Sequence, residues 1–184
     1  MTQRYQAGFA KQLVNQLIAI VQRDQQAALN IVNGTRPSDR ALVPLAGFFK
    51  EAAPIQNWPA LVLVAQRTQF DPAADIGLRD ETHTCFCTLA ISGADPEWLA
   101  DDAMDYLRAV DIVLTSVPLG DFYLPLPIIH PTVPGGQTTG LNPAVSKMQD
   151  LRITGHELGA LVRRRGGALT RSPEIEFEIE LEEM

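Results

Sequence analysis

The sequence predicts an α+β protein that folds as a single domain, and three observations lead to this prediction. Its 184 residues match the length of roughly one domain. Apolar residues recur at helical spacing in two long segments and at strand spacing in four others. The order of these segments is helix, strand, strand, helix, long loop, strand, strand. That order favours one antiparallel sheet of about four strands with helices packed on one face.

Two segments are predicted to be helices. Apolar residues recur in steps of three and four from Gln6 to Asn33, and Gly34 then suits a helix end. The second helix starts at Asp95-Pro96-Glu97, where Asp95 can cap the free N–H groups and Pro96 fits the first turn. It runs to about Ser116. Its buried stripe is expected to consist of Trp98, Leu99, Ala103, Tyr106, Leu107, Val110, Val113 and Leu114.

Four segments are predicted to be strands. Residues 60–70 and 81–91 are rich in β-branched and apolar residues, and the short link between them favours an antiparallel pair. Residues 150–157 form a third candidate. The fourth, Glu174–Glu182, alternates strictly between glutamate and apolar residues. Because alternate side chains of a strand point to opposite faces, its apolar residues should face a core and its glutamates should face away.

Residues 118–149 interrupt this pattern with six prolines and four glycines. Such a long segment without regular structure is uncommon inside a compact domain and is usually functional or mobile. We therefore expect a single domain over residues 1–184 that carries an extended Pro/Gly-rich loop or arm at about 118–149.

Composition excludes several classes of protein. Hydrophobic residues make up 46% of the chain, which excludes a disordered protein. The net charge of −7 argues against wrapping nucleic acid, since such binding depends on clustered Lys and Arg. The apolar runs are too short to span a bilayer, and no signal peptide is visible, so we expect folding in a cytoplasm and no membrane partner. Cys85 and Cys87 are then expected to be reduced.

The sequence predicts no enzyme, no cofactor and no metal site. The sequence contains neither a nucleophile elbow nor a phosphate-binding loop. His83, Cys85 and Cys87 would share one face of a strand, but three ligands in a straight row cannot easily close a tetrahedron around a metal. Asp101, Asp102 and Asp105 fall in the first half of a helix, where a solvated polar face is a simpler explanation than catalysis.

Two charged groups allow both a structural and a functional interpretation. Arg163, Arg164 and Arg165, with Arg152 and Arg171 nearby in sequence, form either a solvated turn or a patch that meets an acidic face on a neighbouring subunit. The acidic row consists of Glu174, Glu176, Glu178, Glu180 and Glu182. It could protect an edge strand from aggregation, or it could line the lumen of a ring and let DNA pass without sticking.

The order of elements and several local features resemble the tail terminator, or tail completion, proteins of long-tailed bacteriophages, neck proteins similar to the lambda minor tail protein U. These features are the N-terminal helix, the strand introduced by Trp58-Pro59, the strand at residues 82–91, the helix start at Asp95-Pro96-Glu97-Trp98 and the alternating strand at 175–181. The resemblance covers residues 6–116 and 150–183.

The resemblance implies a structural virion protein of the tail or neck, assembled in the host cytoplasm, with no activity and no cofactor. Six copies would form a ring that caps the tail tube and joins it to the head–tail connector. Its partners would be other copies of itself, the tail tube protein and the connector, while DNA would pass through without specific binding.

Two alternatives remain open. The chain could be another neck adaptor or non-catalytic binding module that uses residues 118–149 for recognition. It could also be a hydrolase or metal enzyme centred on His83 and on Asp101 and Asp102.

Overall fold

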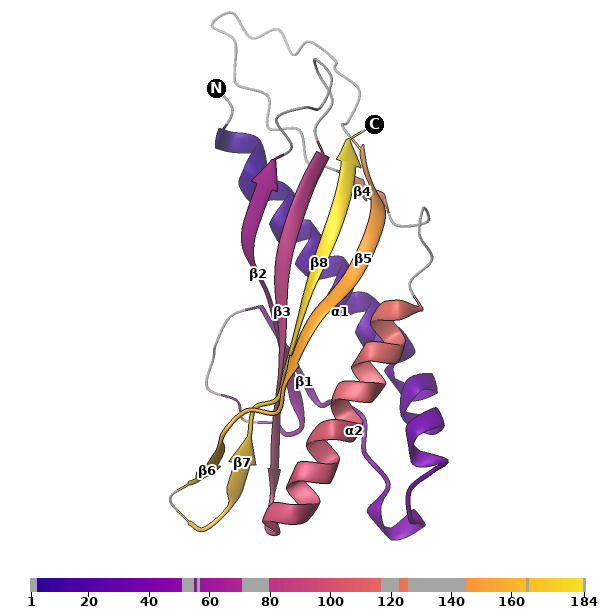
Figure 1. Cartoon of the computed structure of the whole chain (residues 1–184), viewed down its shortest axis with the longest axis vertical. Helices are drawn as coiled ribbons and strands as arrows, with labels where there is room; N and C mark the ends of the chain where they lie inside the picture. Colours follow the sequence, from indigo (N-terminus) through magenta and orange to yellow (C-terminus); the bar gives the residue numbers. More distant parts are fainter. Residues whose placement is uncertain are drawn as a thin grey trace, which may run out of the picture.

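A strongly curved sheet and two helices make up the fold (Figure 1). The computed structural model describes residues 3–50, 55, 57–70, 80–116, 123–125, 145–164 and 166–183. Helix α1 spans Gln3–Asn33 and helix α2 spans Pro96–Thr115, as the periodicity predicts. Within these residues, neither helix combines the length and the apolar character that crossing a bilayer requires.

Four long strands form the middle of the sheet and pair with one another in antiparallel fashion. They are β2 (Ala60–Phe70), β3 (Asp80–Gly93), β5 (Val145–Glu157) and β8 (Glu174–Glu183). Their order is β2-β3-β8-β5, so β8 is inserted between two strands that precede it in the chain. The predicted pairing of residues 60–70 with 81–91 is confirmed, with Leu63 opposite Cys87.

Four strands of three residues each extend this sheet, which therefore has eight strands within the described residues and not about four. They are β1 (Gly47–Phe49), parallel to β2; β4 (Tyr123–Pro125), paired with β5; and β6 (Leu161–Arg163) and β7 (Leu169–Arg171), which form a hairpin attached to β3. A 3-10 helix spans Ser38–Arg40. Strands of three residues are too short to show an alternating pattern, so the sequence could not reveal them.

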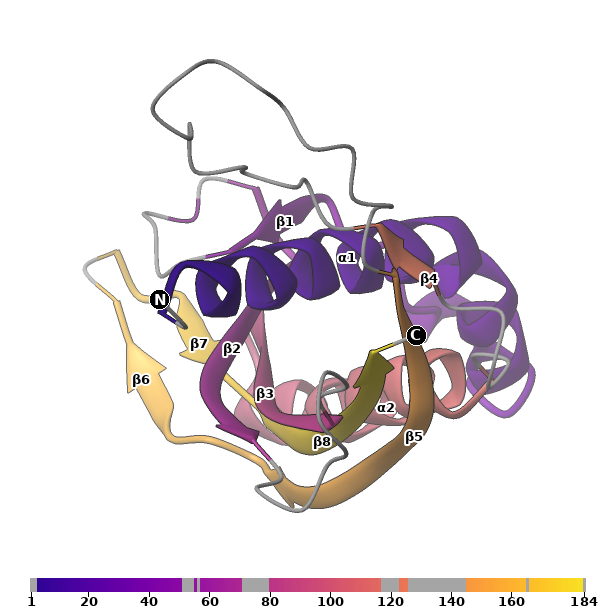
Figure 2. The same ribbon diagram turned by 90° about the horizontal axis from the view of Figure 1, so that it is seen from above.

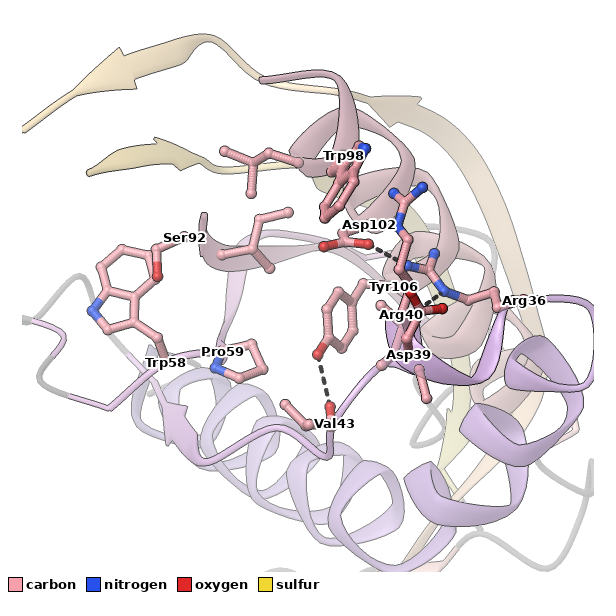
Figure 3. A pocket seen from close by; sticks show the side chains of 14 residues that line it. Arg36, Asp39, Arg40, Val43, Trp58, Pro59, Ser92, Trp98, Asp102 and Tyr106 are labelled. Atoms are coloured by element: carbon pink, nitrogen blue, oxygen red, sulfur yellow. Dashed lines mark hydrogen bonds and ion pairs between the residues drawn. The ribbon is translucent and has the colours of Figure 1, made fainter. Parts of the chain in front are cut away.

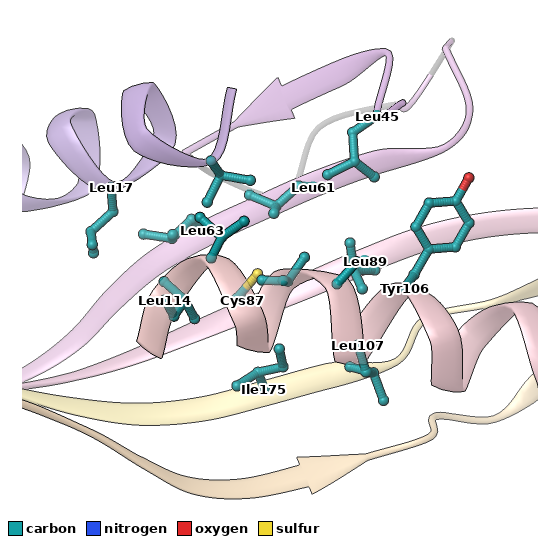
Figure 4. Packing of buried hydrophobic residues seen from close by; sticks show 14 of the residues in the cluster. Leu17, Leu45, Leu61, Leu63, Cys87, Leu89, Tyr106, Leu107, Leu114 and Ile175 are labelled. Carbon is teal, nitrogen blue, oxygen red and sulfur yellow. The ribbon is translucent and has the colours of Figure 1, made fainter. Parts of the chain in front are cut away.

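Both helices pack on one face of the sheet, and the α+β prediction is confirmed. Seen from above, β2, β3, β8 and β5 curve around α1 (Figure 2). The core lies between, where alternate residues of the strands meet the apolar stripes of the helices (Figure 4). Phe177 of β8 is fully buried in this core, as are Leu17, Leu63, Cys87, Leu114 and Ile175.

The start of α2 follows its sequence signals. Asp95 Oδ1 accepts hydrogen bonds from the backbone N–H groups of Glu97, at 2.8 Å, and Trp98, at 3.0 Å. The predicted buried stripe is confirmed from Leu99 to Leu114. The prediction that Trp98 belongs to it is wrong, because this side chain is 54% exposed. Trp98 lies in the first turn of α2. Its ring packs against the Arg40 guanidinium and does not enter the core.

The Pro/Gly-rich segment is partly regular. Residues 145–149, expected in the loop, are the first residues of β5, and Tyr123–Pro125 forms β4. Residues 117–122 and 126–144 lie outside the described part of the chain. The bounds predicted for this segment are therefore too wide at its C-terminal end.

Candidate functional site

The predicted glutamate row lies on the sheet face that the helices leave uncovered. Glu174, Glu176, Glu178 and Glu180 alternate along β8 with buried Ile175, Phe177 and Ile179. Because the sheet curves toward α1, this uncovered face is its convex side (Figure 2). The side chain of Glu182 lies outside the described part of the chain. We call this surface, comprising Glu174, Glu176, Glu178 and Glu180, the acidic face.

The position of β8 corrects one interpretation of the acidic face. Charged residues often protect an edge strand from pairing with another chain. β8, however, is hydrogen-bonded to β3 on one side and to β5 on the other, so both of its edges are already paired. Edge protection therefore does not explain the four glutamates.

Only part of this charge is compensated locally. Arg152 of β5 donates to Glu178 Oε2 at 2.6 Å, and this hydrogen bond raises the pKa of Arg152. Thr88 donates to Glu174 Oε2 at 2.9 Å. Within the described residues, Glu176 and Glu180 have no ion-pair partner. The acidic face thus presents uncompensated negative charge to solvent.

The arginine triplet lies at the tip of the β6–β7 hairpin, which we call the arm (residues 161–171). Arg163 and Arg164 are exposed, and Arg165 lies outside the described residues. The Arg164 guanidinium lies over the Trp58 ring, 4.7 Å from its centre. Gly159 leads into the arm with φ of +73°, and a Cβ there would lie 2.2 Å from the Ser172 carbonyl oxygen. Only glycine fits this close approach.

The patch predicted around the arm is not assembled from all five arginines. Arg152 lies on the acidic face and pairs with Glu178, while Arg171 lies on β7 opposite Ile91. Among the described residues of the arm, Arg163 and Arg164 are therefore the exposed basic ones.

The row of His83, Cys85 and Cys87 does point to one face, and that face is the core. All three side chains are fully buried. The His83 ring hydrogen-bonds through Nδ1 to Thr68 Oγ1, at 3.0 Å, and through Nε2 to Glu81 Oε2, at 3.1 Å. Burial raises the pKa of the Cys85 thiol to about 12 and also raises the pKa of Cys87. These groups thus form part of the packed interior, with both thiols protonated.

The three aspartates of α2 are engaged in ion pairs and are not simply a solvated face. Arg36, whose side chain is 7% exposed, binds Asp102 through Nη2 and Asp105 through Nη1. Burial by itself lowers the pKa of Arg36, but the hydrogen bonds to the two aspartates outweigh it and leave the pKa raised. Arg40 lies 3.5 Å from Asp101. The loop after α1 is therefore tied to α2 by charge.

These ion pairs form one wall of a half-open pocket of about 380 Å³ (Figure 3). Trp58 and Trp98 flank it, and Val43, Pro59 and Ile91 add apolar surface. Tyr106 lies inside, where its hydroxyl donates to the Val43 carbonyl at 2.7 Å, and burial raises its pKa to about 12. The pocket thus combines exposed aromatic surface with charged groups that are already paired.

Sequence reasoning missed this pocket because its residues come from distant segments. Arg36 and Asp105 are 69 positions apart, and Tyr106 and Val43 are 63 apart. One signal was present: two arginines four residues apart, Arg36 and Arg40, can meet the acidic residues spaced along one face of α2.

Comparisons with known proteins add little. No protein-family model matches the chain, and no curated protein matches it in sequence. A solved chain described as "Virion of native gene transfer agent (GTA) particle" is 14% identical, with a TM-score of 0.41 over 85% of this chain and 93% of that chain. A match this loose assigns neither a family nor a function.

Proposed function

We propose that this protein is a structural subunit of a phage-like virion, a tail terminator whose copies form a ring between the tail tube and the head–tail connector. The proposal rests on the resemblance in element order and on one structural observation. That observation is the acidic face, which lies on a strand whose edges are both paired and on the sheet side that no helix covers.

The acidic face suits a surface past which DNA moves. Carboxylates repel phosphates, so a wall that carries them offers no binding energy to a passing duplex. Within the described residues, neither Glu176 nor Glu180 forms an ion pair, and the one ion pair on this face joins Arg152 to Glu178. In the proposed ring this face lines the lumen, and the tail tube protein and connector bind at the two ends.

The proposal assigns the chain no reaction. Three candidate residues from the described part of the chain are engaged elsewhere: both His83 ring nitrogens are hydrogen-bonded, and Asp102 and Asp105 bind Arg36. Both thiols have raised pKa values, which disfavours the reactive thiolate.

Native mass spectrometry and negative-stain imaging of the purified protein test the ring. Six copies of a 20.2 kDa chain give about 121 kDa, and the images should show closed particles with a central hole. A chain that stays monomeric at every concentration, with purified tail tubes present as well as absent, would contradict the proposal.

The orientation of the acidic face needs a separate measurement. Both native cysteines are fully buried, so an introduced Glu176→Cys thiol can be labelled selectively with a maleimide-linked gold cluster. We expect the gold inside the hole of the imaged ring. Ala27→Cys, on the exposed face of α1, is the matched control and should place the gold elsewhere. Gold from Glu176→Cys on the outer rim would refute the lumen assignment.

A further inference from the structure

We infer that the arm of one copy docks into the pocket of another copy. This inference rests on the proposed function, because it supplies the contact by which copies would join. The docking surfaces are the arm, with Leu161, Val162 and Arg163, and the pocket flanked by Trp58 and Trp98.

The arm carries apolar side chains that its own chain does not cover. All three residues of β6 are exposed, with Leu161 at 42% and Val162 at 54%. Within the described residues, β6 pairs only with β7, so the backbone groups along its other edge are free to accept a partner. Exposed aliphatic residues on a strand with a free edge are a typical interaction surface.

The pocket offers matching apolar surface. Trp98 and Val43 both line the cavity and are 54% and 56% exposed. This exposure is high for large apolar side chains. Large aromatic residues in such a position are typical of the residues that contribute most to protein–protein binding. The cavity of about 380 Å³ has room for an aliphatic side chain of the arm, and Trp58 and Trp98 would flank it.

Charge supports the same pairing. The arm presents Arg163 and Arg164. Around the pocket, the 3-10 helix and the first turns of α2 present three exposed acidic residues, Asp39, Glu97 and Asp101. Only Asp101 has an ion-pair partner within the described residues, namely Arg40 at 3.5 Å. Opposite charges on two surfaces steer their association and fix its register.

The contact must form between copies. Within one chain, the arm is attached to β3 through β7, and Arg164 already lies over Trp58, yet Leu161 and Val162 remain exposed. The arm therefore does not fill its own pocket. An arm and a pocket are two different surfaces, and a contact between different surfaces that repeats from copy to copy closes a ring when the rotation permits.

Cysteine cross-linking between two single variants tests the docking directly. Val162→Cys places a thiol on the arm and Val43→Cys places one beside the pocket, while the native thiols are inaccessible. We expect a mixture of the two variants, under mild oxidation, to form a covalent dimer that neither variant forms alone. The matched control is Ile31→Cys on α1, because Ile31 is 57% exposed against 56% for Val43. A mixture of Val162→Cys with Ile31→Cys should not cross-link.

The double variant, Val43→Cys with Val162→Cys, separates this inference from the proposed ring. A covalent ladder that ends at the ring supports both. Products that stop at the dimer support docking. They would show that two copies dock into each other, and they would overturn the ring. Cross-linking no greater than with Ile31→Cys overturns the docking, while the mass and image of the native assembly still decide the ring independently.

Charge reversal provides a second readout by sedimentation velocity. Arg163→Glu places like charges together in the contact, and we expect the association of copies to weaken by about tenfold or more. Adding Glu97→Arg to the same chain restores opposite charges and should recover association. Unchanged association of Arg163→Glu, or no recovery in the double variant, would contradict the charge complementarity on which the inference rests.

Discussion

Replacement of Arg36 by methionine should destabilise the fold by about 3 kcal/mol, because this one side chain joins the loop after α1 to helix α2. Its guanidinium binds Asp102 and Asp105, and its Nε donates to the Arg40 carbonyl at 2.7 Å. Methionine retains the length and apolar stem of arginine but removes all three contacts.

The magnitude follows from the burial of each partner. The charged guanidinium is the donor in all three bonds, and hydrogen bonds that involve a charged group contribute roughly 1.5–3 kcal/mol each. The side chains of Asp102 and Asp105 are 34% and 27% exposed, so water replaces part of what they lose. The sum is therefore nearer to about 3 kcal/mol than to the full value of three buried bonds. For a chain of this length, such a loss lowers the melting temperature by roughly 6–12 °C.

Urea denaturation followed by circular dichroism, at one fixed protein concentration, measures this effect. The midpoint should fall while the denaturant slope stays constant. Arg36→Lys, which keeps the charge but cannot contact both aspartates in the same way, should lie between the wild type and the methionine variant. Arg23→Met removes the exposed pair with Asp24 on α1 and should leave the midpoint unchanged. If Arg36→Met unfolds at the wild-type midpoint, the assigned role of the ion pairs is wrong.

Three further predictions concern the two thiols, the Tyr106 hydroxyl and the cap of α2. Cys85 and Cys87 should not react with a thiol reagent such as Ellman's reagent at pH 8 until the protein unfolds, and rapid reaction of the native protein would show that the core is open. Tyr106→Phe removes the hydrogen bond to Val43 and should cost about 1 kcal/mol at neutral pH in the same urea assay. Burial raises the folded-state pKa of Tyr106 from 10.0 to about 12. The stability that the protonated phenol contributes is therefore complete below about pH 10 and is lost as the pH rises toward 12. The phenylalanine variant has no phenol to ionise and should lose less stability over that interval. Asp95→Ala removes the cap of α2 and should cost about 1 kcal/mol, whereas Asp95→Asn should retain most of it.

The elements of this fold could be predicted wherever one chain segment carries the whole signal. The three- and four-residue spacing of α1, the cap and proline of α2 and the alternation along residues 174–182 each reflect local geometry, and the structure confirms all three. Alternation determines which side chains share a face, but it does not reveal which strands lie on either side. For that reason the sequence left open an edge position for β8, whereas the structure places it in the middle of the sheet.

The pocket could not be predicted, because it forms only when the chain is folded. Arg36 was not singled out, since an isolated arginine in a loop is usually solvated. Trp98 was assigned to the core because helical spacing does not show where the supporting sheet ends. For the arm, the sequence predicts only a solvated turn or a basic patch at its three arginines. Its hairpin pairing involves three residues on each strand, which is too few for a periodic signal.

The central place of β8 also determines when this sheet can close during synthesis. β2 and β3 can pair as a hairpin as soon as both have left the ribosome, but β5 cannot join them, because the position beside β3 belongs to a strand that is translated later. Until β8 emerges, the part of β3 from Asp80 to Thr88 and one edge of β5 lack their partner strand. Translation order therefore makes β8 the segment whose arrival converts two separate pieces into one cooperative unit.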